Sequence, residues 1–323
     1  MSVLPAYSKA WKTVKHRQRL KTDEKDAATI TALAAQGDYV SFPFLQPIYA
    51  ELRHLVSARE RLSVMRNASL SRTKATLQIL FPEFERIFKD FQKPTARALM
   101  KAFPGPEEVL SAPKSKVVNL LRKMSRGQMG EQTYDQLHAA AAASLALPGE
   151  MVSLKAELHL LLEQVAFYTQ QIKIIEARME NTLRALPEAQ SLLTIPGVAP
   201  VTAAVFLGCL GDPRAYSSSR QVLRLAGMSL VEDSSGARRG VVHLSKHGRP
   251  LLRRFAFMLG LRAVRAKDGI YHGAFNRMLK RNGAKKLPAI IAVGRDMLCL
   301  MFAVARDRRT FTVAPPSRGH GLA

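Results

Sequence analysis

The amino-acid sequence predicts a mainly α-helical protein with more than one hydrophobic core. Apolar residues recur at helical intervals over long stretches, of which 48–81, 154–179 and 287–304 are the clearest. Proline and glycine lie mostly between these stretches, where they end helices and form turns. At 323 residues and 47% hydrophobic content, the chain is long enough for roughly two domains.

The N-terminal part begins with a basic segment and continues as a helix. Residues 9–21 contain six Lys or Arg and no acid, and a helix is expected from Thr22 to a stop at Gly37. Asp23 and Asp26 are three residues apart, so they share a helix face and can hold a divalent cation between them. Acids in a first turn also offset the helix dipole, and Thr22 or Asp23 is a good cap. From their spacing alone, Asp23 and Asp26 are better explained as acids that stabilise the start of the helix than as ligands of a cation.

The middle of the chain predicts two long helices separated by short ones. The segment 48–81 reads as an amphipathic helix with a basic outer face that either faces solvent or contacts nucleic acid. The segment 103–149 reads as short helices and loops. From Leu154 to Met179 the apolar residues alternate steps of four and three, the repeat of a coiled-coil seam. The partner of this seam is either another helix of the chain or a second copy. We expect a homo-oligomer through this helix.

The C-terminal part predicts a phosphate-binding surface. Residues 192–204 read as two helices joined by a tight hairpin at Gly197, whose backbone N–H groups can bind a phosphate. Farther on, a glycine-flanked loop carries Ser234 and Ser235 beside two arginines, and a basic run follows. The cations of this region are Arg238, Arg239, Lys246, Arg249, Arg253 and Arg254. The two serines are alternatively plain turn residues, and Ser245 alternatively caps the helix that begins near Pro250.

Charge and cysteine content narrow the class of protein. Forty-nine Lys and Arg against 25 Asp and Glu give a net charge of +24, and residues 236–286 hold fourteen of these bases with one acid, Asp268. Such a concentration predicts a polyanionic partner, most simply nucleic acid. We expect no signal peptide and no membrane-spanning stretch. Cys209 and Cys299 lie in apolar helical patterns, which predicts free thiols in a reducing cytoplasm instead of a disulfide framework.

Five short motifs follow one another along the chain: 21–27 (KTDEKDA), 193–197 (LTIPG), 225–228 (LAGM), 234–236 (SSG) and 245–254 (SKHGRPLLRR). In order and approximate spacing they resemble the DEDD transposases of bacterial insertion sequences of the insertion-sequence-110 family, and the resemblance covers nearly the whole chain. A purely structural coiled-coil protein is the weaker alternative, since it would not need the charge.

The resemblance implies a fold and a chemistry. It implies a mainly α chain with an incomplete RNase H-like, resolvase-like α/β domain at 1–110, a helical linker and coiled coil at 111–188, and a helical serine transposase domain at 189–323. Asp23 and Asp26 match the last two metal-binding acids of the family, so the resemblance reverses the preference for a cap. Ser235 matches the nucleophile, with Ser234 as the close alternative.

The resemblance also implies the partners. These are DNA, a structured guide RNA known as the bridge RNA, and Mg²⁺ in the bacterial cytoplasm at the nucleoid. The nucleic-acid contacts are expected at Lys21, Gly197, Arg238, Arg239, Lys246, Arg249, Arg253 and Arg254. The expected activity is serine-dependent, metal-assisted DNA strand exchange.

Two features depart from the family pattern. Ala199 stands where the hairpin usually has a second glycine, which reduces how closely a phosphate can approach. The chain also starts after the point where the family has its first aspartate and its glutamate, so we expect either that the true start lies upstream or that this is an N-terminally truncated copy. A catalytically inactive, nucleic-acid-binding remnant is therefore the alternative to an active transposase. It predicts salt-dependent binding without cleavage.

Overall fold

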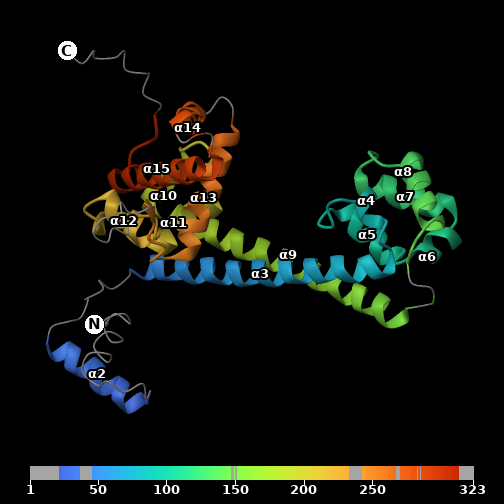
Figure 1. Ribbon diagram of the computed structural model, residues 1–323, viewed down its shortest axis with the longest axis horizontal. Coiled ribbons are helices and arrows are strands. Elements are labelled where there is room, and N and C mark those ends of the chain that lie inside the picture. Colours follow the sequence, from blue (N-terminus) through green and yellow to red (C-terminus); the bar gives the residue numbers. More distant parts are fainter. Residues whose placement is uncertain are drawn as a thin grey trace. The chain divides into compact units, whose positions relative to one another are not determined.

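The computed structural model describes residues 22–36, 46–146, 149, 151–232, 242–266, 270–281, 283 and 285–312. Within these residues the chain is mainly helical and contains one pair of short strands, which confirms the mainly α prediction (Figure 1). The backbone separates into two compact units, Met1–Pro47 and Ile48–Ala323.

The N-terminal unit is described through helix α2 (Asp23–Ala35). The helix starts where predicted, and the amide of Asp26 donates to the carbonyl oxygen of Thr22 at 3.1 Å. The basic segment 9–21 lies outside the described residues. No strand occurs in the described parts of residues 22–110, so the RNase H-like character of this region stays a prediction.

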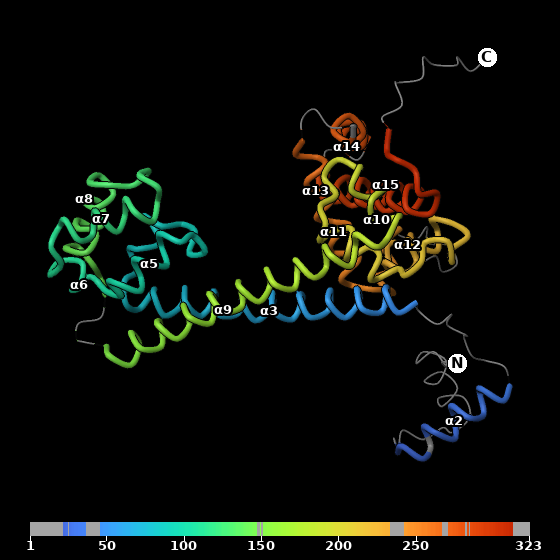
Figure 2. The backbone as a smooth tube through the Cα atoms, turned by 180° about the vertical axis from the view of Figure 1, so that it is seen from behind, coloured from blue at the N-terminus to red at the C-terminus, as the bar shows by residue number. Residues whose placement is uncertain are grey.

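Two long antiparallel helices form the centre of the second unit. Helix α3 (Pro47–Leu80) and helix α9 (Val152–Arg184) lie side by side in both backbone views (Figure 1 and Figure 2). Ser69 Oγ donates to Gln164 Oε1 at 2.9 Å, and Arg59 pairs with Glu176 at 2.7 Å. The predicted seam of α9 is largely buried at Leu158, Leu161, Val165, Ile172 and Met179. In this chain the seam therefore packs within the protomer, with α3 beside it.

A module of short helices packs against one end of this pair. It consists of α4 (Phe84–Ile87), α5 (Pro94–Ala102), α6 (Pro106–Ser111), α7 (Lys114–Ser125) and α8 (Glu131–Ala142), as the glycine and proline breaks predicted. Its core joins Phe81, Leu99 and Leu137 to Leu158 and Leu162 of α9. Proline in the first turn of α5 and α6 fits both helix starts, because its missing N–H has no intrahelical partner there.

The C-terminal module packs at the other end of α3 and α9. Its helices are α10 (Pro187–Leu193), α11 (Pro200–Leu210), the 3₁₀ turn η1 (Pro213–Ala215), α12 (Ser219–Leu225), α13 (Pro250–Arg265), α14 (Ile270–Arg281) and α15 (Lys286–Asp307). Helix α11 is buried from Thr202 to Leu210 and is the centre of this module. Helices α13 and α15 cross where Gly260 meets Gly294, since a Cβ on Gly294 would lie 2.5 Å from the carbonyl oxygen of Ala256.

The two strands form a β-hairpin between α12 and α13. Strand β1 (Leu230–Glu232) pairs antiparallel with β2 (Val242–Leu244), in the register Leu230 to Leu244 and Glu232 to Val242. Sequence reasoning treated 233–240 as an isolated loop, but the paired strands on both sides fix its two ends.

We expected no stretch that is long and apolar enough to span a membrane, and this expectation was wrong for one helix. Helix α15 has the length and hydropathy of a membrane span. In this fold it is a core helix, with Val293, Met297, Leu298 and Met301 buried against its neighbours. Cys209 and Cys299 are free thiols, as predicted. The predicted region boundaries after residues 110 and 188 fall inside α6 and α10 and stay predictions.

Candidate nucleic-acid and catalytic site

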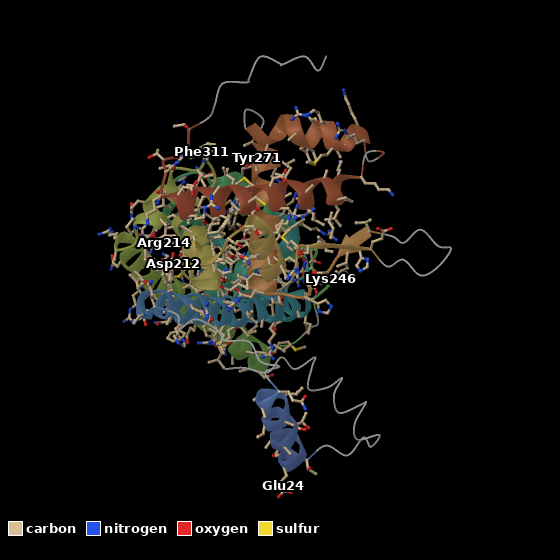
Figure 3. The ribbon with its side chains drawn as sticks, turned by 90° about the vertical axis from the view of Figure 1, so that its left-hand side faces the viewer. Glu24, Asp212, Arg214, Lys246, Tyr271 and Phe311 are labelled. Atoms are coloured by element: carbon tan, nitrogen blue, oxygen red, sulfur yellow. The ribbon has the colours of Figure 1, made fainter. Side chains whose placement is uncertain are left out.

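The acids expected to bind metal lie in the first turn of α2. Asp23 and Glu24 are exposed and Asp26 is half-buried; Figure 3 labels Glu24 on this turn. The described residues contain no group of three or more metal-binding side chains. Two carboxylates nevertheless fit Mg²⁺, which takes oxygen ligands and retains several of its waters. Asp23 and Asp26 are the residues that would hold it.

The predicted nucleophile lies on the connection between the two strands. Ser235, Ser234, Arg238 and Arg239 lie outside the described residues, as does Lys21. The strand residues that flank this segment in the sequence, Glu232 and Val242, pair with each other. Lys246 follows β2 and lies near the hairpin in Figure 3, whereas Asp212 and Arg214 lie at the opposite edge of that view.

The predicted helical hairpin is present between α10 and α11. Gly197 is exposed with φ of +85°, a left-handed conformation that favours glycine, and its amide has no acceptor within the described part of the chain. Val198 N donates to the carbonyl oxygen of Ile195 at 3.1 Å and closes the turn. The amide of Phe311, after α15, donates to Thr194 Oγ1 at 2.8 Å. The turn is therefore stabilised by a hydrogen bond within it, between Val198 and Ile195, and by one from the C-terminal segment, between Phe311 and Thr194.

Two of the family-like motifs form one packed structure. Residues 225–228 end α12, and residues 245–248 lie directly on them. Lys246 N donates to the carbonyl oxygen of Gly227 at 3.0 Å, and Arg249 N donates to that of Leu225 at 2.7 Å. A Cβ on Gly248 would lie 2.3 Å from the backbone nitrogen of Gly227. Glycine is required here because two backbones touch.

Two predicted phosphate ligands make contacts inside the protein. Arg253 Nη1 donates to the carbonyl oxygens of Lys246 at 3.0 Å and Ala226 at 3.2 Å, so it joins the two packed motifs. Arg254 forms a two-point ion pair with Glu60 of α3, which raises the pKa of the arginine through the hydrogen bond to Glu60. Lys246 is exposed and Arg249 is half-buried, so these two are the better placed to meet a ligand.

Sequence reasoning left open whether the basic face of α3 contacts nucleic acid, and it did not predict that this helix contacts the C-terminal module. Arg53 and Glu60 are seven residues apart on one helix face, and both reach the C-terminal module: Arg53 Nε donates to the carbonyl oxygen of Gly208 at 2.8 Å. The heptad spacing was the available signal. It could not identify the partners, which lie about half the chain away.

The Arg254–Glu60 pair gives a first prediction. Arg254→Gln and Glu60→Gln should each lower the free energy of unfolding by at most about 1 kcal/mol, because a half-exposed ion pair is screened by solvent. Urea denaturation of both variants and of the double variant measures the coupling. Because Arg254 is assigned a structural role in the pair with Glu60, Arg254→Gln should leave the affinity for polynucleotide unchanged. A loss of affinity in Arg254→Gln without a matching loss of stability would contradict this assignment.

The interlocked motifs at 225–228 and 245–248 lie in a part of the chain that matches a known family of DNA-acting proteins. The family pattern described as "Transposase IS116/IS110/IS902 family" matches residues 189–272, and a DEDD transposase pattern of the same family matches residues 1–82. The chain belongs to the IS116/IS110/IS902 family of transposases. It is therefore a transposase, and DNA is its partner.

Individual relatives agree with the family. The 44.8 kDa protein of insertion element IS116 from Streptomyces clavuligerus is 25% identical over 300 residues, which are 92% of this chain and 74% of that protein. The transposase of insertion sequence element IS1328 from Yersinia enterocolitica is 35% identical over 108 residues, which are 33% of this chain and 31% of that protein. A pilin gene-inverting protein from Moraxella bovis is 28% identical over 160 residues, covering 46% of this chain and 48% of that protein.

Proposed function

We propose that this transposase cleaves and joins DNA through Ser235, with Asp23 and Asp26 binding Mg²⁺ and a structured RNA selecting the DNA sites. One structural observation carries the proposal. Strands β1 and β2, which flank Ser235 in the sequence, pair with each other; β1 follows the motif at 225–228, β2 leads into the motif at 245–248, and these two motifs are interlocked. Lys246 and Arg249 follow β2 in the chain, so two cations come directly after the strands that flank the proposed nucleophile.

The proposed step conserves phosphoester bonds. The Ser235 hydroxyl attacks a DNA phosphorus, forms a serine–phosphate bond and loses its proton, while the departing strand end leaves as a hydroxyl and gains one. Attack by the hydroxyl of another strand end on the serine-linked phosphorus reverses these bonds and joins the DNA. Mg²⁺ held by Asp23 and Asp26 would polarise the phosphate. Arg238 and Arg239 are placed in the sequence to stabilise its developing charge.

The nucleic-acid surface is proposed to include the helical hairpin and the loop before α13. Gly197 offers an exposed amide, and Lys246 and Arg249 offer positive charge. These groups contact backbone phosphate without reading bases. Site choice is then left to base pairing with a guide RNA, the arrangement that the family resemblance implies. The proposed location is the bacterial cytoplasm at the nucleoid.

We place self-association on the outer face of α9. The predicted coiled-coil seam is used inside the protomer, but Leu160, Phe167 and Ile174 follow one another every seven residues and are 62%, 57% and 39% exposed. Seven-residue spacing puts them on one stripe. A second copy of the chain would bury this stripe.

Replacing Phe167 with glutamate should therefore weaken self-association. Burial of a phenylalanine contributes about 1.5–3 kcal/mol, so the dissociation constant of the self-associated form should increase at least tenfold. Light scattering over a dilution series measures the molar mass. Ala166→Glu adds the same charge to an exposed residue beside the stripe and is the control. Equal behaviour of the two variants would remove α9 as the interface.

The catalytic proposal is tested by adduct formation. The full chain is incubated with labelled DNA carrying the element ends and with the adjacent transcribed RNA, with Mg²⁺ or with chelator. We expect a covalent protein–DNA species that survives denaturation and requires both Mg²⁺ and RNA. Binding of both nucleic acids without any adduct would instead favour a non-catalytic binding protein.

A further inference from the structure

Two arginines from distant parts of the chain converge on Cys209. Arg53 of α3 donates from Nε to the carbonyl oxygen of Gly208 at 2.8 Å, and its Nη2 lies 3.5 Å from the carbonyl oxygen of Cys209. Arg249, the residue before α13, lies close enough to the same Cys209 for its charge to lower the pKa of the thiol, against the larger raising effect of burial. Both guanidinium groups therefore lie at the last turn of α11.

Among the residues that the structure describes, no carboxylate neutralises this pair. Neither arginine has a carboxylate partner within the described part of the chain, although Glu60 neutralises Arg254 two turns farther along α3. Burial raises the pKa of the Cys209 thiol and of the nearby Tyr216 hydroxyl, so both stay neutral. Burial and then the charge of Arg249 lower the pKa of Arg53, as expected for two like charges held together.

The surroundings suit a phosphate group. Both arginines are half-buried, and the loop that carries Arg249 also carries exposed Lys246 and His247. Tyr216 donates to the carbonyl oxygen of Leu210 at 2.8 Å and fixes the wall beside the pair. Guanidinium forks bind phosphate oxygens in pairs, and two forks that face one anion remove their mutual repulsion.

We propose that Arg53 and Arg249 together bind one backbone phosphate of the polynucleotide, which adds helix α3 to the nucleic-acid surface. The proposal rests on the polynucleotide binding proposed above. It differs from a generally cationic surface in one respect, because both side chains act on the same phosphate.

The test uses the full chain and a fluorescein-labelled DNA duplex, with affinity measured by anisotropy over a range of salt concentrations. Arg249→Gln, Arg53→Gln and Arg53→Lys should each weaken binding roughly tenfold. Each glutamine variant should lower the slope of log affinity against log salt by about 0.9, the value for one phosphate contact, because the remaining guanidinium alone does not hold the phosphate. Arg53→Lys keeps the charge and should leave this slope unchanged. The double glutamine variant should lower the slope by the same amount as either single variant. Lys123→Gln, which removes an exposed charge on α7, is the matched control.

A second measurement separates this proposal from the function on which it depends. The melting temperature of each variant is followed with inorganic phosphate and with chloride at equal ionic strength. We expect phosphate to stabilise the wild-type protein and not Arg249→Gln, which keeps the contact between Arg53 and α11. If phosphate stabilises the protein but DNA does not bind, the two arginines form an anion site and the proposed polynucleotide binding is wrong. DNA binding with unchanged slopes in the glutamine variants, or a doubled loss of slope in the double variant, would overturn the shared phosphate.

Discussion

Ser235→Ala is expected to abolish the covalent protein–DNA linkage and with it transposition. Removing a nucleophile typically costs on the order of 10³-fold or more in rate, because no neighbouring group forms the same covalent intermediate. The measurement is the amount of denaturation-resistant labelled DNA on the protein, together with transposition frequency in cells. Binding of DNA should persist, since the phosphate contacts lie on other residues.

Ser234→Ala is the matched control for this prediction. It removes an identical hydroxyl one residue away, so it should retain the adduct and most of the transposition. Loss of activity in Ser234→Ala and not in Ser235→Ala would exchange the two roles. Retention of the adduct in both single variants and in the double variant would reject serine chemistry at this hairpin.

Gly294→Ala is expected to destabilise the C-terminal module. Helices α13 and α15 touch through their backbones, and the added Cβ would lie 2.5 Å from the carbonyl oxygen of Ala256 and 3.1 Å from its carbonyl carbon. Neither atom can move without separating the helices. We expect a loss of about 1–3 kcal/mol, the usual cost of overpacking, and a melting temperature several degrees lower.

Gly273→Ala, on a neighbouring helix, is expected to stabilise the protein. Gly273 is exposed on α14, and a Cβ added there would meet only the end of the Arg277 side chain at 3.6 Å. Alanine should stabilise this helix by about 0.5–1 kcal/mol, because it restricts the unfolded chain. Circular dichroism melting of both variants checks the pair. Gly260→Ala combined with Gly294→Ala should not be additive, since both residues lie at one crossing.

The helical framework followed from local sequence. The Pro-Gly breaks, the apolar intervals of 48–81 and the heptads of 154–179 predicted α3, the short helices and α9, because helix starts, stops and buried faces depend on residues a few positions apart. The hairpin at Gly197 was predicted for the same reason. The β-hairpin was missed, since its strands are only three residues long and are exposed, so neither carries a burial pattern.

The composition and motifs of the sequence determined that this is a cationic, helical transposase. Tertiary structure alone decided what each cation does. Arg254 pairs with Glu60, which lies 194 residues away in the chain, and Arg253 bonds carbonyl oxygens of the interlocked motifs. Arg53 and Arg249 both lie at Cys209, and no acid pairs with either of them in the described part of the chain. A linear charge pattern cannot distinguish these cases, because the role of a guanidinium depends on which oxygens the fold brings within hydrogen-bonding distance.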